Sequence, residues 1–154
     1  MLFRSLAAVE RRFRRLGHVQ PIAARPGRRF AIGSLTVRAV SVPHARDTPT
    51  LAWRIGDSDR ALVYASDVAR LTSQLARAAD AAQLLIVDGA MWRRSLYTHL
   101  RIDHAVPELC RWPVGRIVLT QIGRSAPRHE DLVREVAALC PRAAPGFDGM
   151  EIDV

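Results

Sequence analysis

Four polar residues that can bind a metal ion or accept a proton stand at the ends of apolar segments. They are His44, Asp67, Asp88 and Gln121. Reactive groups in an open α/β sheet collect at the carboxyl ends of strands, so we expect His44, Asp67 and Gln121 to share one site. Zinc binds imidazole nitrogen and carboxylate oxygen, and a carboxylate that bridges two metals helps to lower the pKa of a shared water. His44 and Asp67 are therefore candidate metal ligands.

Each of these residues also has a purely structural interpretation. Asp67 could be the N-cap of a helix, because its carboxylate can accept from free backbone N–H groups. His44 could be a loop histidine bonded to the backbone, and Asp88 could belong to a simple turn with Gly89. Gln121 could satisfy neighbouring backbone groups. Their joint position at strand ends favours the site, and both interpretations stay open.

The remaining histidines do not form a recognisable metal motif. His99, His104 and His129 lack the H-x-H or i, i+4 spacing of a preformed site. A catalytic zinc site needs about three protein ligands, so the third and fourth ligands are missing from any motif in this chain. His99 is the candidate for proton transfer or for supporting a ligand.

The elements that must position these residues form a β-meander followed by alternating strands and helices, which is an α/β pattern. Periodicity predicts an amphipathic helix over 2–16 and a linker over 21–27. The other predicted helices are 67–82, 103–111 and 129–139. The predicted strands are 29–32, 35–42, 51–55, 61–65, 84–87, 117–120 and 150–154.

Charge is concentrated at the start of the chain. Residues 1–46 contain 10 Arg and one acid, a balance of +9, whereas residues 47–154 contain 13 Arg and 14 acids, a balance of −1. This excess could attract a phosphate-bearing substrate or nucleic acid, or it could be a solvated helix face. We expect the solvated face.

Composition places the chain among globular proteins of one domain. No apolar run approaches the length that spans a bilayer, and the start lacks a clear secretory signal. We therefore expect a cytoplasmic protein without membrane association. Cys110 and Cys140 have no metal spacing, and we expect buried, reduced thiols.

Four segments carry a resemblance to a known family. They are Val42-Pro43-His44, the run from Asp47 to Ile55, the run from Leu62 to Ser66-Asp67, and the closing run from Gly146 to Ile152 with its Asp-Gly-Met-Glu. From about residue 30 to 154, the chain resembles metallo-β-lactamase-fold hydrolases. The nearest branches are similar to ribonuclease Z, to cyclic phosphodiesterases of phosphonate breakdown and to the pyrroloquinoline quinone biosynthesis B protein.

The resemblance implies a fold, a cofactor and a reaction. Residues 28–154 would form the C-terminal half of an αββα sandwich, preceded by a basic helix and linker over 1–27. His44 and Asp67 would bind zinc, of which a complete site holds two, and the reaction would be metal-assisted hydrolysis of a small-molecule or nucleotide phosphodiester. Asp67 and His99 would act in catalysis.

This sequence departs from the family pattern at two places. Gln121 stands where the family's Leu-Thr-His element has its last histidine ligand, and the H-x-H-x-D-H motif is absent. We therefore expect a truncated or inactive hydrolase, a fragment or a gene begun at internal Met1, with weak or no zinc binding and a tendency to form a homodimer. Two alternatives remain, a non-catalytic α/β module that has lost its metal and a basic nucleic-acid-binding domain.

Overall fold

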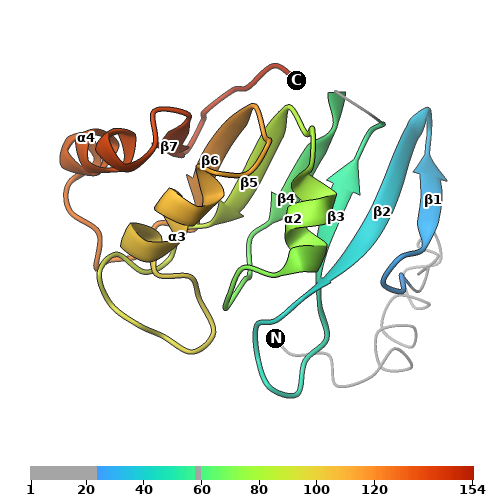
Figure 1. The fold of residues 1–154 in the computed structure, drawn as a ribbon, viewed down its shortest axis with the longest axis horizontal. Helices are drawn as coiled ribbons and strands as arrows, with labels where there is room; N and C mark the ends of the chain where they lie inside the picture. The colour runs from blue at the N-terminus through green and yellow to red at the C-terminus, as the bar shows by residue number, and fades with distance from the viewer. Residues whose placement is uncertain (1–23, 58–59) are drawn as a thin grey trace.

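A computed structural model describes residues 24–57 and 60–154 and shows a single mixed sheet (Figure 1). Seven strands follow one another across the sheet in chain order. The strands are β1 (Arg29–Ile32), β2 (Leu35–Val42), β3 (Thr50–Ile55), β4 (Leu62–Ala65), β5 (Leu84–Asp88), β6 (Arg116–Thr120) and β7 (Ala143–Pro145). The first four pair antiparallel and the last four pair parallel, so β4 belongs to both regions.

Three helices connect the parallel strands. They are α2 (Ser73–Ala79), α3 (Ile102–Leu109) and α4 (His129–Leu139). Crossovers between parallel strands are right-handed, so three successive crossovers in one direction place their helices on the same face. Buried Leu75, Leu109 and Leu132 from the three helices accordingly share one core with alternate strand residues such as Val63 and Leu85.

The opposite face of the sheet carries a second apolar row. Tyr64, Ile86 and Val118 lie side by side in the register of β4, β5 and β6. Tyr64 is 39% exposed. Phe147 and Met150 of the C-terminal segment line a cavity of about 520 Å³ over this row.

The expected fold class is confirmed, and most expected strands agree within one residue. The predictions of two elements were wrong. The helix predicted over 67–82 is confined to Ser73–Ala79, because Thr72 caps it by accepting from the backbone N–H of Leu75. The strand predicted over 150–154 is absent from the described residues, and β7 lies earlier in the chain. The predicted helix over 2–16 lies outside the described residues.

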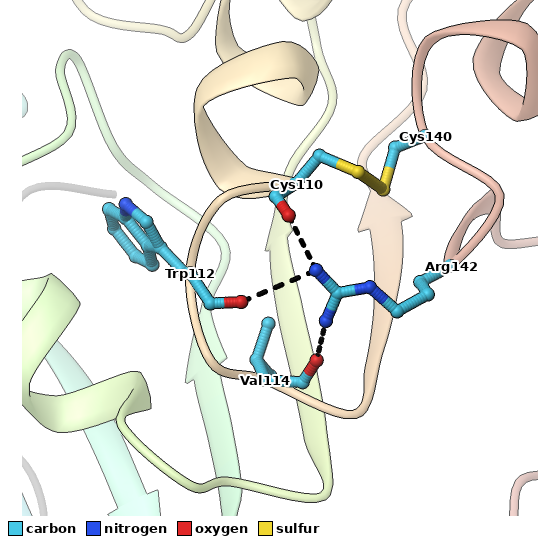
Figure 2. Close-up of a disulfide and its surroundings, with 5 residues drawn as sticks. All are labelled: Cys110, Trp112, Val114, Cys140 and Arg142. Atoms are coloured by element: carbon cyan, nitrogen blue, oxygen red, sulfur yellow. Dashed lines mark hydrogen bonds between the residues drawn. A yellow bond between two sulfur atoms is a disulfide. The ribbon is translucent and has the colours of Figure 1, made fainter.

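The prediction of reduced thiols was also wrong, because Cys110 and Cys140 form a disulfide (Figure 2). The two cysteines are the C-caps of α3 and α4, and their Cα atoms lie 5.6 Å apart. Arg142 donates beside the disulfide to the carbonyls of Cys110 and Val114, and satisfies the end of α3. Thirty residues separate the cysteines, and closing a loop of that length stabilises a fold by about 3–4 kcal/mol in the chain-entropy account.

Candidate metal and proton-transfer site

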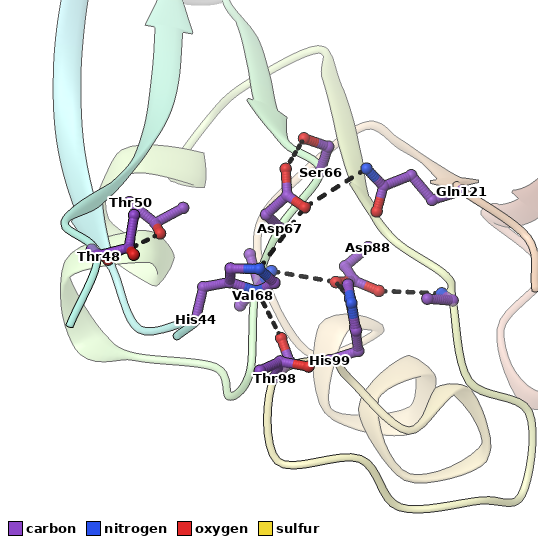
Figure 3. Close-up of polar contacts among 11 residues, drawn as sticks. His44, Thr48, Thr50, Ser66, Asp67, Val68, Asp88, Thr98, His99 and Gln121 are labelled. Carbon is purple, nitrogen blue, oxygen red and sulfur yellow. Dashed lines mark hydrogen bonds and ion pairs between the residues drawn. The ribbon is translucent and has the colours of Figure 1, made fainter. Parts of the chain in front are cut away.

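The loops after β2 and β4 lie against each other and bring His44 close to Asp67 (Figure 3). A backbone hydrogen bond of 2.7 Å from the N–H of Ala69 to the carbonyl of Pro43 joins the two loops. Nε2 of His44 lies 3.9 Å from Oδ1 of Asp67. The hydroxyl of Ser66 donates to the other carboxylate oxygen at 2.8 Å, and so fixes the orientation of Asp67.

The hydrogen bonding of His44 selects the tautomer of its neutral ring. Nδ1 lies 2.7 Å from the carbonyl oxygen of Thr98. A carbonyl only accepts, so Nδ1 carries a hydrogen, and in the neutral ring the lone pair is then at Nε2. In that form Nε2 of His44 and the carboxylate of Asp67 would be two electron-rich groups that face each other, and a cation between them would stabilise both. Histidine ligands of metals usually show this arrangement, with the other ring N–H bound to a carbonyl or carboxylate.

Asp88 orients the second histidine of the site. Its carboxylate is fully buried and accepts from the backbone N–H groups of Val68 at 3.1 Å and Ala90 at 2.9 Å. Nδ1 of His99 lies 2.6 Å from Oδ2 of Asp88. An ionised carboxylate only accepts, so Nδ1 of His99 carries a hydrogen, and in the neutral ring the lone pair is then at Nε2. The rings of His99 and His44 meet edge to face, with centroids 5.0 Å apart.

Gln121 completes the group from the end of β6. Its Nε2 lies 3.5 Å from Oδ1 of Asp67, at the limit of a hydrogen bond. The backbone of Gln121 has a φ of 57°, in the left-handed region that few side chains favour. Gly89 allows the ends of β5 and β6 to approach, because a Cβ there would meet the carbonyl of Thr120 at 2.9 Å. A Cβ on Gly123 would come still closer to the carbonyl oxygen of Ala90.

The structure therefore brings His44, Asp67 and Gln121 together, as their places at strand ends led us to expect. The N-cap interpretation of Asp67 was wrong, because Thr72 caps α2. His99 lies beside the same group, whereas His104 and His129 lie on helices α3 and α4. From the sequence, Asp88 could be a polar strand-end group or a turn residue, and its bond to His99 was not predicted. The sequence signal that could have indicated a buried, functional Asp88 is its place at the end of the otherwise apolar strand Leu84–Asp88.

The candidate ligand atoms are of the types that zinc binds, but there are too few of them for a complete site. His44 and Asp67 offer one nitrogen and one carboxylate, and a catalytic zinc site has about three protein ligands. Across the part of the chain that the structure describes, no group of three or more His, Cys, Asp or Glu side chains could hold a metal ion. These residues therefore fit one side of a metal site.

Comparison with known proteins gives the family. Residues 2–122 match the family described as Beta-lactamase superfamily domain. The chain belongs to this superfamily. Its structure also resembles solved structures with the metallo-β-lactamase fold.

Three solved structures share the fold. The Zn(2+)-bound PqqB from Methylobacterium extorquens superposes with a TM-score of 0.72 at 20% identity, over 88% of this chain and 55% of that one. The metallo-beta-lactamase fold protein YhfI from Bacillus subtilis gives 0.72 at 20% identity, over 88% and 56%. A diphosphatase from the PhnP family gives 0.76 at 17% identity, over 94% and 52%. The chain spans about half the length of these proteins.

One curated relative is similar in sequence. An octanoyltransferase from Porphyromonas gingivalis (strain ATCC BAA-308 / W83) is 24% identical over 127 residues, which are 82% of this chain and 24% of that protein. The similarity therefore covers about a quarter of that protein's length.

Within the described residues of this chain, none of the helices is both long and apolar enough to cross a bilayer.

The bonds of Asp88 generate a prediction for stability. Replacing Asp88 with Ala leaves two backbone N–H groups and a histidine ring without their buried acceptor, so we expect the free energy of unfolding to fall by about 3–5 kcal/mol. Asp131→Ala is the matched control, because it removes an exposed carboxylate paired with Arg134 and should cost less than about 1 kcal/mol. Urea unfolding measures both. Equal stability of the two variants would refute the role given to Asp88.

Proposed function

We propose that this chain contributes one side of a metal-dependent hydrolase site and that the substrate is a phosphodiester, either a small molecule or a nucleotide. His44 and Asp67 are the zinc ligands in this proposal. The observation that carries it is the 3.9 Å approach of His44 Nε2 to the Asp67 carboxylate, with Nδ1 directed at the carbonyl of Thr98. Among the structural relatives, PqqB holds zinc and the PhnP-family protein is named a diphosphatase, which supports both the metal and the phosphorus chemistry.

The residues of this chain would perform three tasks. His44 and Asp67 would hold the metal, with Ser66 and the carbonyl of Thr98 fixing their orientations. A bound metal would supply Lewis acidity and an activated water. His99, held by Asp88 through Nδ1, would use its Nε2 to carry a proton to or from the substrate. Its half-buried ring, next to that of His44, is suitably placed for this role.

Gln121 supports a second candidate, a non-catalytic module that keeps the fold without the metal. An amide is a poor zinc ligand, and Gln121 occupies the place beside Asp67 where another imidazole would add a donor. The same measurement separates the two candidates, because it asks whether His44 and Asp67 bind zinc at all.

We expect this 154-residue chain to bind zinc weakly and not to hydrolyse phosphodiesters. Gln121→His should raise zinc affinity by about tenfold or more, because it adds an imidazole beside Asp67, and metal affinity depends on ligand number and support. Histidine is also well tolerated at a positive φ. Zinc titration, together with turnover of a chromogenic phosphodiester, measures these effects. His104→Gln is a control that removes an exposed histidine outside the site.

Three outcomes bear on this proposal. Loss of zinc binding in His44→Ala and Asp67→Ala, with His104→Gln unchanged, supports the ligand assignment. Zinc binding that is indifferent to His44, Asp67 and Gln121 favours the non-catalytic module. Near-stoichiometric zinc that survives dialysis of the unaltered chain would contradict the incomplete site, and would imply that His99 completes it.

We also propose that two copies of the chain associate through the second face of the sheet. Tyr64 and Phe147, which line the same cavity on this face, are 39% and 59% exposed, and exposed apolar surfaces drive association. We expect a dimer in sedimentation, and a monomer for Tyr64→Glu, which places a charge in that face. Tyr97→Glu is the control, because Tyr97 is 80% exposed in the loop between β5 and α3. A monomeric unaltered chain would refute the proposal.

A further inference from the structure

Three arginines stand directly opposite one another on adjacent strands. The register pairs Arg29 of β1 with Arg38 of β2, and Arg38 with Arg54 of β3. Directly opposite side chains in an antiparallel pair have Cβ atoms about 5 Å apart, and like charges at that spacing destabilise the sheet. A bound anion would offset this repulsion.

The arginines line a cavity of about 290 Å³. Its lining consists of Arg29, Thr36, Arg38, Arg54, Gly56, Asp57, Arg77 and Asp80. Four arginines and two aspartates give these residues a net charge of +2. The cavity lies near the start of β4, since Ile55 pairs with Leu62, whereas the His44 and Asp67 group follows the end of β4. The two sites are therefore at opposite ends of the parallel strands.

Arg54 is the residue of this cavity whose position is fixed by hydrogen bonds to α2. One of its guanidinium nitrogens, Nη1, donates to the carbonyls of Ala78 at 2.6 Å and Asp80 at 3.1 Å, at the C-terminal end of α2. Burial and the nearby charge of Arg38 lower the pKa of Arg54 from its ordinary value. The carbonyls hold Arg54 in place, and Arg38 adds a second positive charge directly beside it.

We propose that this cavity binds the phosphate group of a small anionic ligand. Guanidinium groups present planar pairs of N–H donors that match phosphate oxygens, and several arginines around one cavity are typical of phosphate recognition. Thr36 adds a hydroxyl to the same lining. The ligand binds away from the metal site, so this is a second site on the chain and does not depend on the proposed function.

Thermal unfolding with added phosphate or pyrophosphate, at an ionic strength held constant with sodium chloride, tests this site. We expect pyrophosphate near saturation to raise the Tm by about 5 °C or more, because a ligand that binds only the folded state stabilises it. Arg38→Gln should weaken binding by about tenfold or more, as expected for the loss of a charged hydrogen-bonding group. Arg77→Gln, on the exposed surface of α2, should also weaken pyrophosphate binding.

Arg134→Gln is the matched control, since it removes one exposed arginine from α4. It should keep the full response to pyrophosphate. Without added anion, Arg38→Gln should unfold at the same temperature as the unaltered chain or higher, because the repulsion across β1, β2 and β3 is relieved. A merely structural role for Arg38 would instead lower that temperature. An equal response to pyrophosphate in Arg38→Gln and Arg134→Gln would overturn the proposal.

Two further arms identify the source of the phosphate. His44→Ala should bind pyrophosphate as the unaltered chain does, and loss of binding in that variant would place the anion at the metal site and overturn the proposal. A single-stranded oligonucleotide is the last probe. Binding of the oligonucleotide with no response to phosphate or pyrophosphate would overturn the assignment to a small ligand and favour a nucleic-acid backbone.

Discussion

The candidate site depends on the buried carboxylate of Asp88. Within the part of the chain that the structure describes, Asp88 is the one buried charged or polar residue, with 1% of its surface exposed. Burying a carboxylate costs several kcal/mol unless donors surround it. Val68, Ala90 and His99 supply those donors, from the loop after β4, the loop after β5 and the segment before α3. The carboxylate of Asp88 thus forms hydrogen bonds to three segments that carry or flank the candidate functional groups.

The same bonds connect the fold to its chemistry. Val68 follows Asp67 directly, so the bond from Val68 to Asp88 also fixes the backbone beside the proposed ligand. Gly89 keeps the ends of β5 and β6 close, which places Gln121 beside Asp67. The opposite end of the sheet has a different character, because Arg29, Arg38 and Arg54 gather positive charge there. The His44 and Asp67 group thus lies at one end of the parallel strands and the arginine cavity at the other.

Sequence patterns predicted what depends on local chemistry and missed what depends on contacts between distant segments. The alternation in Leu35–Val42 and the helical period of His129–Leu139 gave those elements their observed bounds. The prediction of a helix beginning at Asp67 was wrong. The apolar periodicity extends back to Asp67, but the helix begins at Ser73 and Asp67 lies in the loop that carries the candidate site. The disulfide and the bond between Asp88 and His99 join residues 30 and 11 positions apart, and no local pattern encodes either. The meeting of His44 and Asp67 was predictable, since it follows from a general property of strand ends.

The central claim is that His44 presents a lone pair at Nε2 toward Asp67, ready for a cation. The ¹⁵N chemical shifts of the His44 ring, recorded with and without zinc, test this claim directly. We expect a neutral ring protonated at Nδ1, toward Thr98, and a zinc-dependent shift at Nε2 that disappears in Asp67→Ala. A ring protonated at Nε2, donating to Asp67 and unmoved by zinc, would contradict it.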